Sequence, residues 1–266
     1  MSPAIAVIVG SAIQMGAFGR PEPVRVETPW GPWTLYRVER ADRPTYVSFR
    51  HDYPHRLLPN QIPYRAQAWA LREVGCGGLL VTSSVGVLTA SLPLYEPLVL
   101  TDILTLDNRL PDGSACTMFT EPDARHGHLV LNEGLFSGAL SRQAAALAGR
   151  ARDEAVVFGY VGGPRTKTPA ENRMWRDLGA HVNSMTLAPE VILANELEIP
   201  CAGLVVGHKY SVPDIDAPGD REAVAETLER SRLAFERAVL AFLQRAEPVA
   251  FGNHLFRFTN PGEGHA

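Results

Sequence analysis

Residues 45–73 read TYVSFRHDYPHRLLPNQIPYRAQAWALRE, and they contain the pattern of a strand, a polar loop and a helix in succession. The run Thr45–Phe49, rich in β-branched and aromatic residues, predicts a buried strand, and polar residues begin directly after it. Apolar residues at helical spacing predict a helix over Tyr64–Glu73, which Gly75 ends. This stretch is therefore one unit of an α/β fold.

The same alternation continues along the chain. Further strands are predicted by four apolar runs, Ile5–Val9, Leu79–Thr82, Ala155–Val161 and Gly203–Val206. Further helices are predicted over Ala188–Leu197, over about Arg221–Arg245, and after Thr168, where Pro169 and Glu171 form a capping-box pattern. Alternating strands and helices predict the α/β class. Because the sequence contains no internal repeat or low-complexity linker, we expect a single domain over residues 1–266, with a surface loop at Tyr210–Asp220.

Composition and charge exclude several classes of protein. The 266 residues are 45% hydrophobic and 20% charged, which is typical of a globular chain. The formal net charge is −4 and the cations are scattered, so no nucleic-acid partner is expected. Cys76, Cys116 and Cys201 lie far apart in the sequence and suit a reducing compartment. No cation precedes Arg20 and the uncharged segment Gly77–Leu94 is rich in polar residues, so we expect no membrane association and a cytoplasmic location.

Groups suited to an oxygen anion follow several predicted strands. They are Gly10-Ser11, Arg50-His51, Thr82-Ser83-Ser84 and, before a helix, Met185-Thr186. The carboxyl ends of strands converge in an α/β sheet, and hydroxyls, an Arg fork and free backbone amides are the groups that bind phosphate. Each of these pairs is also common in ordinary turns, so the residues alone leave the function open.

Two long blocks resemble the trimeric purine nucleoside phosphorylase and methylthioadenosine phosphorylase family. The first block is Arg50-His51-Asp52-Tyr53-Pro54-His55, Pro59, Ile62, Tyr64-Arg65-Ala66 and Ala70-Leu71. The second is Gly163-Pro164-Arg165, Thr168, Ala170-Glu171, Arg173-Met174, Leu178-Gly179-Ala180, Met185-Thr186, Pro189-Glu190-Val191 and Leu193-Ala194. The resemblance extends from about Ile5 to Leu243 and implies a central, mixed, twisted β-sheet flanked by helices.

The resemblance also implies roles for individual residues. Six of them fall on the family's phosphate-binding positions: Ser11, Arg50, His51, Ser83, Ser84 and Thr186. Met185 falls where the family packs a Met against the sugar, and His128 where a residue reaches the sugar of a neighbouring subunit. A homotrimer, or a dimer of trimers, is thus implied. Inorganic phosphate is the implied co-substrate, with no metal or organic cofactor.

The base-binding positions depart from the family pattern. Thr166 stands where the family has a Phe that packs on the purine, and Lys167 replaces a Glu or Ser. Gly207-His208-Lys209 replaces a run in which Asp or Asn meets the purine N7. All of these departures concern the base half of the ligand, whereas the phosphate half is retained.

These departures suggest a different leaving group. His208 can donate a hydrogen bond to a departing base, and Lys167, which only donates, favours an acceptor-rich or anionic group over a base that presents N1–H. We therefore predict His208, Arg50 and His51 as catalytic residues and a non-standard aglycone. The alternatives are a Lys167 that extends into solvent and a His208 bonded to main chain at a strand end. Arg221, where relatives touch the 5′ substituent, is either a selector of that group or an exposed first-turn residue.

The leading hypothesis is a pentosyltransferase that cleaves the N-glycosidic bond of a nucleoside or 5′-modified nucleoside with phosphate. A nucleoside hydrolase on the same fold is a second hypothesis, but no clear carboxylate is placed to act as its general base. A non-catalytic paralogue that binds a nucleoside or phosphate is the third. It explains an altered base site and gives no reason to keep every phosphate position.

Overall fold

The computed structural model describes residues 2–150, 155–213, 215 and 221–257, and of residues 221–227 only the backbone. The strands are β1 (Ala4–Val9), β2 (Glu22–Val26), β3 (Trp33–Arg37), β4 (Thr45–Phe49), β5 (Cys76–Val87), β6 (Pro97–Val99), β7 (Asp102–Leu104), β8 (His128–Val130), β9 (Val157–Tyr160), β10 (Val182–Ser184), β11 (Cys201–Tyr210) and β12 (His254–Phe256). The α-helices are α1 (Tyr64–Glu73), α2 (Gly138–Leu147), α3 (Pro169–Asp177), α4 (Ala188–Glu196) and α5 (Arg221–Arg245), and short 3-10 turns lie at Met15–Phe18 and Pro59–Gln61.

Ten strands form one mixed sheet, as the resemblance implied. Along its main path the order is β2-β3-β4-β1-β5-β10-β9-β7, and β11 pairs with both β5 and β6. The β1–β4, β1–β5, β5–β11, β9–β10 and β7–β9 pairs are parallel, whereas the β2–β3, β3–β4, β5–β10 and β6–β11 pairs are antiparallel. The α/β class predicted from the sequence is confirmed.

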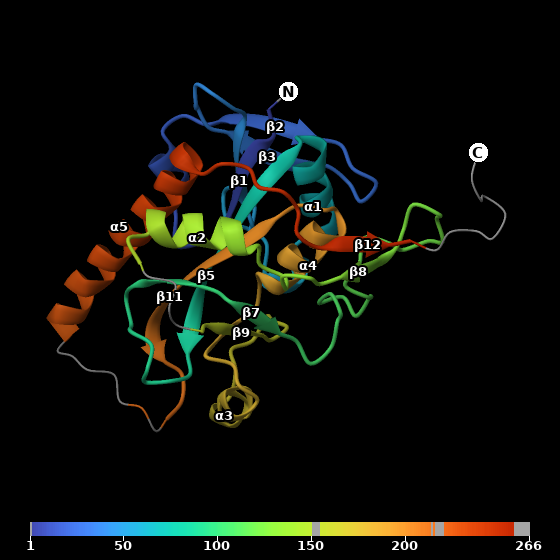
Figure 1. Cartoon of the computed structure of the whole chain (residues 1–266). Coiled ribbons are helices and arrows are strands. Elements are labelled where there is room, and N and C mark those ends of the chain that lie inside the picture. The colour runs from blue at the N-terminus through green and yellow to red at the C-terminus, as the bar shows by residue number, and fades with distance from the viewer. Residues whose placement is uncertain (1, 151–154, 214, 216–220, 258–266) are drawn as a thin grey trace, which may run out of the picture.

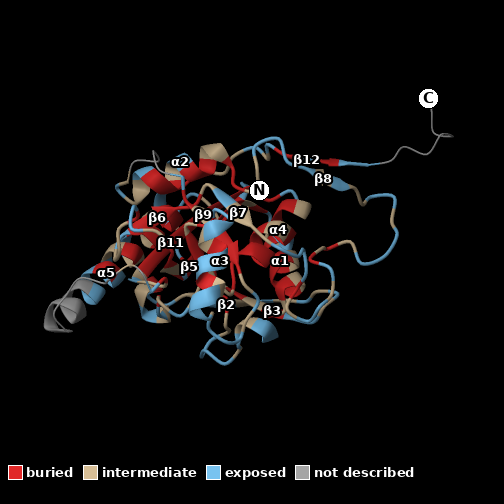
Figure 2. Cartoon of the chain, turned by 90° about the horizontal axis from the view of Figure 1, so that it is seen from below, coloured by how far each residue is buried: buried red, intermediate tan, exposed pale blue. Residues whose placement is uncertain are grey.

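Helices cover both faces of this sheet (Figures 1 and 2). Alternate residues of β1 point to opposite faces. Ile5, Val7 and Val9 share a core with residues of α2 and α5, whereas Ala6 and Ile8 share one with residues of α1 and α4. The whole of β1 is therefore buried, which explains why its sequence is a continuous apolar run.

β5 is much longer than the sequence run predicted. The expected strand Leu79–Thr82 continues to Val87, because β11 pairs along it as far as Val87. On its other edge, the β1 pairing ends at Val81 and the β10 pairing begins at Gly86. Residues 82–85 lie between these two partner strands. Ser83 and Ser84 thus belong to a strand and not, as predicted, to the loop after one.

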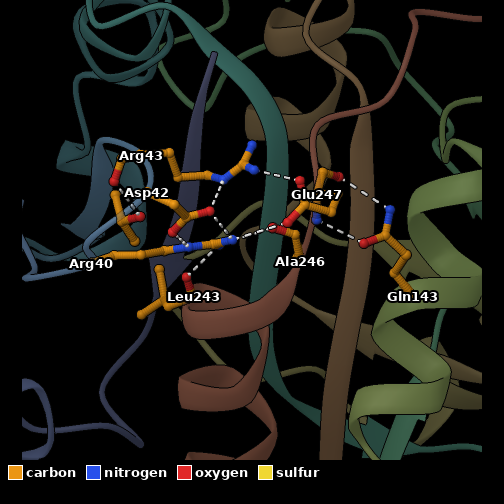
Figure 3. A network of polar contacts seen from close by, with 8 residues as sticks. Arg40, Asp42, Arg43, Gln143, Leu243, Ala246 and Glu247 are labelled. Atoms are coloured by element: carbon orange, nitrogen blue, oxygen red, sulfur yellow. Dashed lines mark hydrogen bonds and ion pairs between the residues drawn. The ribbon is translucent and has the colours of Figure 1, made fainter. Parts of the chain in front are cut away.

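The C-terminal end of α5 is tied to the loop between β3 and β4 by Arg40 (Figure 3). The Arg40 side chain is 5% exposed and donates to the carbonyl oxygens of Leu243 and Ala246, at 3.0 and 2.9 Å. These carbonyls belong to the last turn of the helix, where backbone acceptors lack helical partners and a cation is favoured. Glu247 extends the network to Gln143 of α2. The network therefore holds two helices of one layer to the sheet.

A separate two-stranded sheet, β8 with β12, projects from the right of the view in Figure 1. The helix predicted over Tyr64–Glu73 has those bounds, and Thr168 forms the predicted capping box with Glu171. The Arg221 side chain and part of the predicted loop Tyr210–Asp220 lie outside the described residues. In the described part of the chain, no helix is both long and apolar enough to span a bilayer.

Candidate active site

The centre of the site is the buried guanidinium of Arg50, directly after β4. Its Nε donates to Glu190 Oε1 of α4 at 2.5 Å, and the two side chains are 1% and 0% exposed. Its Nη2 is buried and has no hydrogen-bond partner among the described residues. A buried cationic N–H without an acceptor is costly, so this atom is a strong candidate for contact with a bound anion.

Hydroxyl groups lie next to this centre. Thr186, between β10 and α4, is linked to Arg50 through Glu190, which accepts from the N–H of the following residue, Leu187, at 2.5 Å. Its hydroxyl is 3.5 Å from the Ser83 hydroxyl, and both side chains are buried. Ser84 is exposed, and its carbonyl accepts from the hydroxyl of Ser184 at 2.9 Å. The segment of β5 between its two partner strands thus joins Arg50 in one polar cluster.

Gly10, directly after β1, lies against the guanidinium of Arg50. A Cβ built at this position would lie 3.0 Å from Arg50 Nη1, closer than an ordinary contact. The neighbouring Ser11 and the ring of His51 line one small pocket with it. The structure thus places Ser11 and His51 in one pocket next to Arg50, and links the Ser83–Thr186 hydroxyl pair to Arg50 through Glu190. Ser84 follows Ser83 in β5 and is exposed.

His51 is held in a defined tautomer. Its Nδ1 lies 2.8 Å from the carbonyl oxygen of Leu57, which accepts only from a protonated nitrogen, so Nδ1 carries the hydrogen. The ring stacks on His55 with 4.4 Å between ring centroids. Burial, together with the positive charge of Arg50, lowers the pKa of His51 to about 4. His51 is therefore neutral at physiological pH, with Nε2 available as an acceptor.

Met185 packs against the loop that follows β9. Its Sδ lies 2.9 Å from the position of a Cβ built on Gly163, so only a glycine leaves room for this contact. Met185 itself directly precedes Thr186 and is half-buried. The predicted sugar-binding Met is thus next in the chain to one of the hydroxyls in the cluster.

The three predicted base-binding residues lie on two elements. Thr166 is exposed and Lys167 is half-buried, and both precede α3. Burial, and secondly repulsion from Lys209, lowers the pKa of Lys167 to about 8, which places the two lysines near each other. Lys167 is therefore not fully extended into solvent.

His208 lies near the end of β11, two residues beyond Val206, which pairs with Ser84. The register between β5 and β11 shifts between Gly207 and Tyr210, so the strand is irregular at His208. Its ring is half-buried near Tyr95, with centroids 5.9 Å apart, and burial lowers its pKa. His208 thus lies on the strand that pairs with the hydroxyl-bearing segment of β5, whereas Thr166 and Lys167 lie outside the sheet.

His128 lies elsewhere, on the exposed face of β8 in the projecting two-stranded sheet. It lines a pocket with residues that include Phe119 and Glu196. Sequence reasoning missed two members of the site, Glu190 and Ser184. The signal for Glu190 was available, since it is the one charged residue before Glu196 in the apolar helix Ala188–Glu196.

No metal site accompanies these residues. Across the described ranges, no group of three or more His, Cys, Asp or Glu side chains is placed to hold a metal ion. The fold and the cluster define a class of protein: an α/β protein with a polar cluster at the end of β4 and beside the middle of β5, built from one buried Arg and several hydroxyls.

Comparison with known proteins identifies the family. A family model described as the phosphorylase superfamily matches residues 4–244, so the chain belongs to that superfamily and is an enzyme. A probable S-methyl-5'-thioinosine phosphorylase from Methanopyrus kandleri is 35% identical over 238 residues, covering 86% of this chain and 87% of that protein. The S-methyl-5'-thioadenosine phosphorylase of Pyrococcus horikoshii is 31% identical over 257 residues, 92% of each chain.

Solved structures share the fold. The methylthioadenosine phosphorylase of Schistosoma mansoni in complex with tubercidin superposes with a TM-score of 0.75 at 24% identity, covering 91% of this chain and 90% of that one. A methylthioadenosine phosphorylase from an antarctic soil metagenomic library gives a TM-score of 0.73 at 22% identity, covering 91% and 86%. The family resemblance seen in the sequence is confirmed.

Proposed function

We propose that this protein is a pentosyltransferase that cleaves the N-glycosidic bond of a nucleoside with inorganic phosphate. A phosphate oxygen attacks the anomeric carbon, the bond from that carbon to the base nitrogen breaks, and its electron pair leaves with the base. The proton of hydrogen phosphate ends on the base, so that the products are free base and pentose 1-phosphate. No metal or organic cofactor takes part.

The observation that carries this proposal is the unpartnered Nη2 of Arg50. Nε is already bonded to Glu190, so Nη2 is the buried donor of this guanidinium that is available to a second acceptor. A phosphate at this position also receives the Ser83 and Thr186 hydroxyls and backbone amides of residues 10–11. Ser11, Ser84 and His51 complete the set, and neutral His51 accepts the remaining P–OH hydrogen at Nε2.

The sugar and base occupy the side toward α3 and the end of β11. Met185 packs against the pentose. The pKa of His208 is lowered by burial, so its ring is neutral at pH 7 and donates through an N–H to the departing base. Lys167, with a pKa of about 8, is mostly protonated at that pH and stabilises negative charge on the same base. Thr166 lies beside it in the position of the family's aromatic residue.

The substrate class follows from the relatives and from this altered base half. Relatives in archaea are named as phosphorylases of S-methyl-5'-thioadenosine and of S-methyl-5'-thioinosine, so we propose a 5′-modified nucleoside here. Lys167 and His208 favour an aglycone rich in hydrogen-bond acceptors. A turnover panel of purine, 5′-methylthio-purine and non-purine nucleosides, run with and without phosphate, tests this. Turnover of none of them with phosphate present would contradict it.

The assembly we propose is a homotrimer, alone or paired, in which His128 of one subunit reaches the sugar of its neighbour. The support is the position of His128 on a projecting strand pair, away from the Arg50 cluster of its own chain. We also propose that residues 1–266 form one domain and that the protein acts in the cytoplasm, where its three buried cysteines stay reduced.

A further inference from the structure

We propose that Glu190 is the positioning residue of the phosphate site, orienting both the guanidinium of Arg50 and the backbone that carries Thr186. This inference rests on the proposed function, because it assumes that the anion binds at Arg50. Both oxygens of Glu190 already accept from protein donors, and a carboxylate repels an anion, so Glu190 itself does not bind phosphate. Its effect on the reaction is therefore exerted through its two partners.

Each oxygen of the carboxylate has one partner. Oε1 accepts from Arg50 Nε, and Oε2 accepts from the backbone N–H of Leu187, both at 2.5 Å. Neither Glu190 nor Arg50 is more than 2% exposed, so water does not compete for these bonds. Buried hydrogen bonds between a carboxylate and donors that are fixed in place are strong and directional.

The first bond fixes the plane of the guanidinium. Because the guanidinium is rigid and planar, a carboxylate that holds Nε determines where Nη1 and Nη2 point. Nη1 then lies under Gly10, and Nη2 is left buried without a partner. The carboxylate thus aims the free donor and also neutralises the buried charge when no anion is bound.

The second bond holds an unfavourable backbone conformation. Leu187 has φ = 77°, in the left-handed region that side-chain-bearing residues rarely adopt. Its N–H is the donor to Glu190, and it directly follows Thr186, whose hydroxyl lies 3.5 Å from Ser83. One carboxylate therefore sets two separate phosphate ligands relative to each other.

A carboxylate is the only side-chain group of this size that accepts at both ends. The amide of Glu190→Gln has the same shape but presents an acceptor on one side and a donor on the other, so it must lose either Arg50 or Leu187. Glu190→Asp keeps two acceptors and the charge but is shorter by one methylene. Comparing the two variants separates the effect of the negative charge from the effect of side-chain length.

The test is a steady-state comparison of wild type, Glu190→Gln and Glu190→Asp. We expect Glu190→Gln to raise the KM for phosphate at least about tenfold and the KM for the nucleoside less than about twofold. Glu190→Asp gives a smaller rise in the same parameter. The matched control is Glu196→Gln, which removes another partly buried carboxylate of the same helix, bonded to Thr117 and Met118, and leaves the phosphate KM unchanged.

A second arm separates this inference from the proposed site. Arg50→Gln alone must raise the phosphate KM; an unchanged value would refute the phosphate site itself. In the Arg50→Gln background, Glu190→Gln should then add less than about twofold, because its partner is already gone. Fully additive effects, or equal changes in both KM values, would refute the role of Glu190 while leaving the site intact. If Glu190→Gln does not fold, the same comparison is made with Glu190→Asp and with the double variant Arg50→Gln/Glu190→Gln, in which both charges are removed.

Discussion

Arg50 is a charged side chain in a buried position, where a charge without partners would destabilise the fold. Burying an unpaired charge is costly, and here one carboxylate compensates for part of that cost. The remaining donor, Nη2, needs an acceptor that the described protein does not supply. At the scale of single residues, the proposed phosphate would supply this acceptor, and the substitutions that matter most are those that move this guanidinium.

The substitution Gly10→Ala should move the guanidinium of Arg50. The added Cβ would lie 3.0 Å from Arg50 Nη1, so the guanidinium must shift by a few tenths of an ångström. We expect the KM for phosphate to rise about tenfold with the KM for the nucleoside nearly unchanged. Gly16→Ala is the control, since no atom lies within 4 Å of its added Cβ. Equal phosphate KM values for the two variants would show that Gly10 is not needed beside Arg50.

The rate of the reaction should depend on pH through the charge of Lys167. Its pKa is lowered to about 8, so its positive charge is present below that pH and is lost as the pH rises through it. If the charge stabilises the departing base, kcat/KM for the nucleoside falls above about pH 8, and Lys167→Met abolishes this alkaline limb. Lys209→Met removes a repelling charge and should move the limb to higher pH. An identical pH profile in all three proteins would remove Lys167 from the site.

The sequence predicted most of these residues and missed their connections. Arg50 and His51 were recognisable because they follow a clear apolar strand and stand in a family motif. Glu190 was visible as a charge in an apolar helix, but its bond to Arg50 joins positions 140 apart in the sequence. No local pattern reveals such a long-range contact, so only the fold could show that one carboxylate serves two ligands.

At the scale of elements, β5 determines where the site lies. It is flanked by β1 and then by β10 along one edge, and residues 82–85 between them line the site. The sequence predicted α1, α3, α4 and α5 closely because caps and glycine stops are local signals, and it did not predict α2. It ended β5 at Thr82, since the small polar residues that follow resemble a loop. Pairing with β11, a tertiary effect, keeps them in a strand.

At this scale, replacing Arg40 should lower the stability of the protein. Arg40→Met removes the donor to the carbonyl oxygens of Leu243 and Ala246 at the end of α5. We expect the free energy of unfolding to fall by about 1–3 kcal/mol in chemical denaturation, because buried acceptors lose a charged donor. Arg25→Met, which removes an exposed pair with Glu27, should cost less than about 0.5 kcal/mol. Equal losses in the two variants would mean that Arg40 does not anchor the helix.

At the scale of the whole molecule, the proposed trimer divides each site between subunits. Arg50→Gln and His128→Ala each impair a different half of the shared site. When the two impaired proteins are unfolded, mixed and refolded, and assayed at a phosphate concentration far below the raised KM of Arg50→Gln, some sites in mixed trimers contain both native residues. We therefore expect activity to return to about a quarter of wild type at equal mixing. No recovery, with trimers present by sedimentation, would place His128 outside the site.

The proposed function requires that phosphate bound at Arg50 attacks the sugar. The most direct test is ³¹P NMR of wild-type protein during turnover of the best nucleoside from the panel, with the base measured in parallel. We predict one pentose 1-phosphate formed, and one phosphate consumed, for each base released, and both signals reduced together in Arg50→Gln at a phosphate concentration below its raised KM. Release of base with free pentose and no consumption of phosphate would show hydrolysis and would contradict the account.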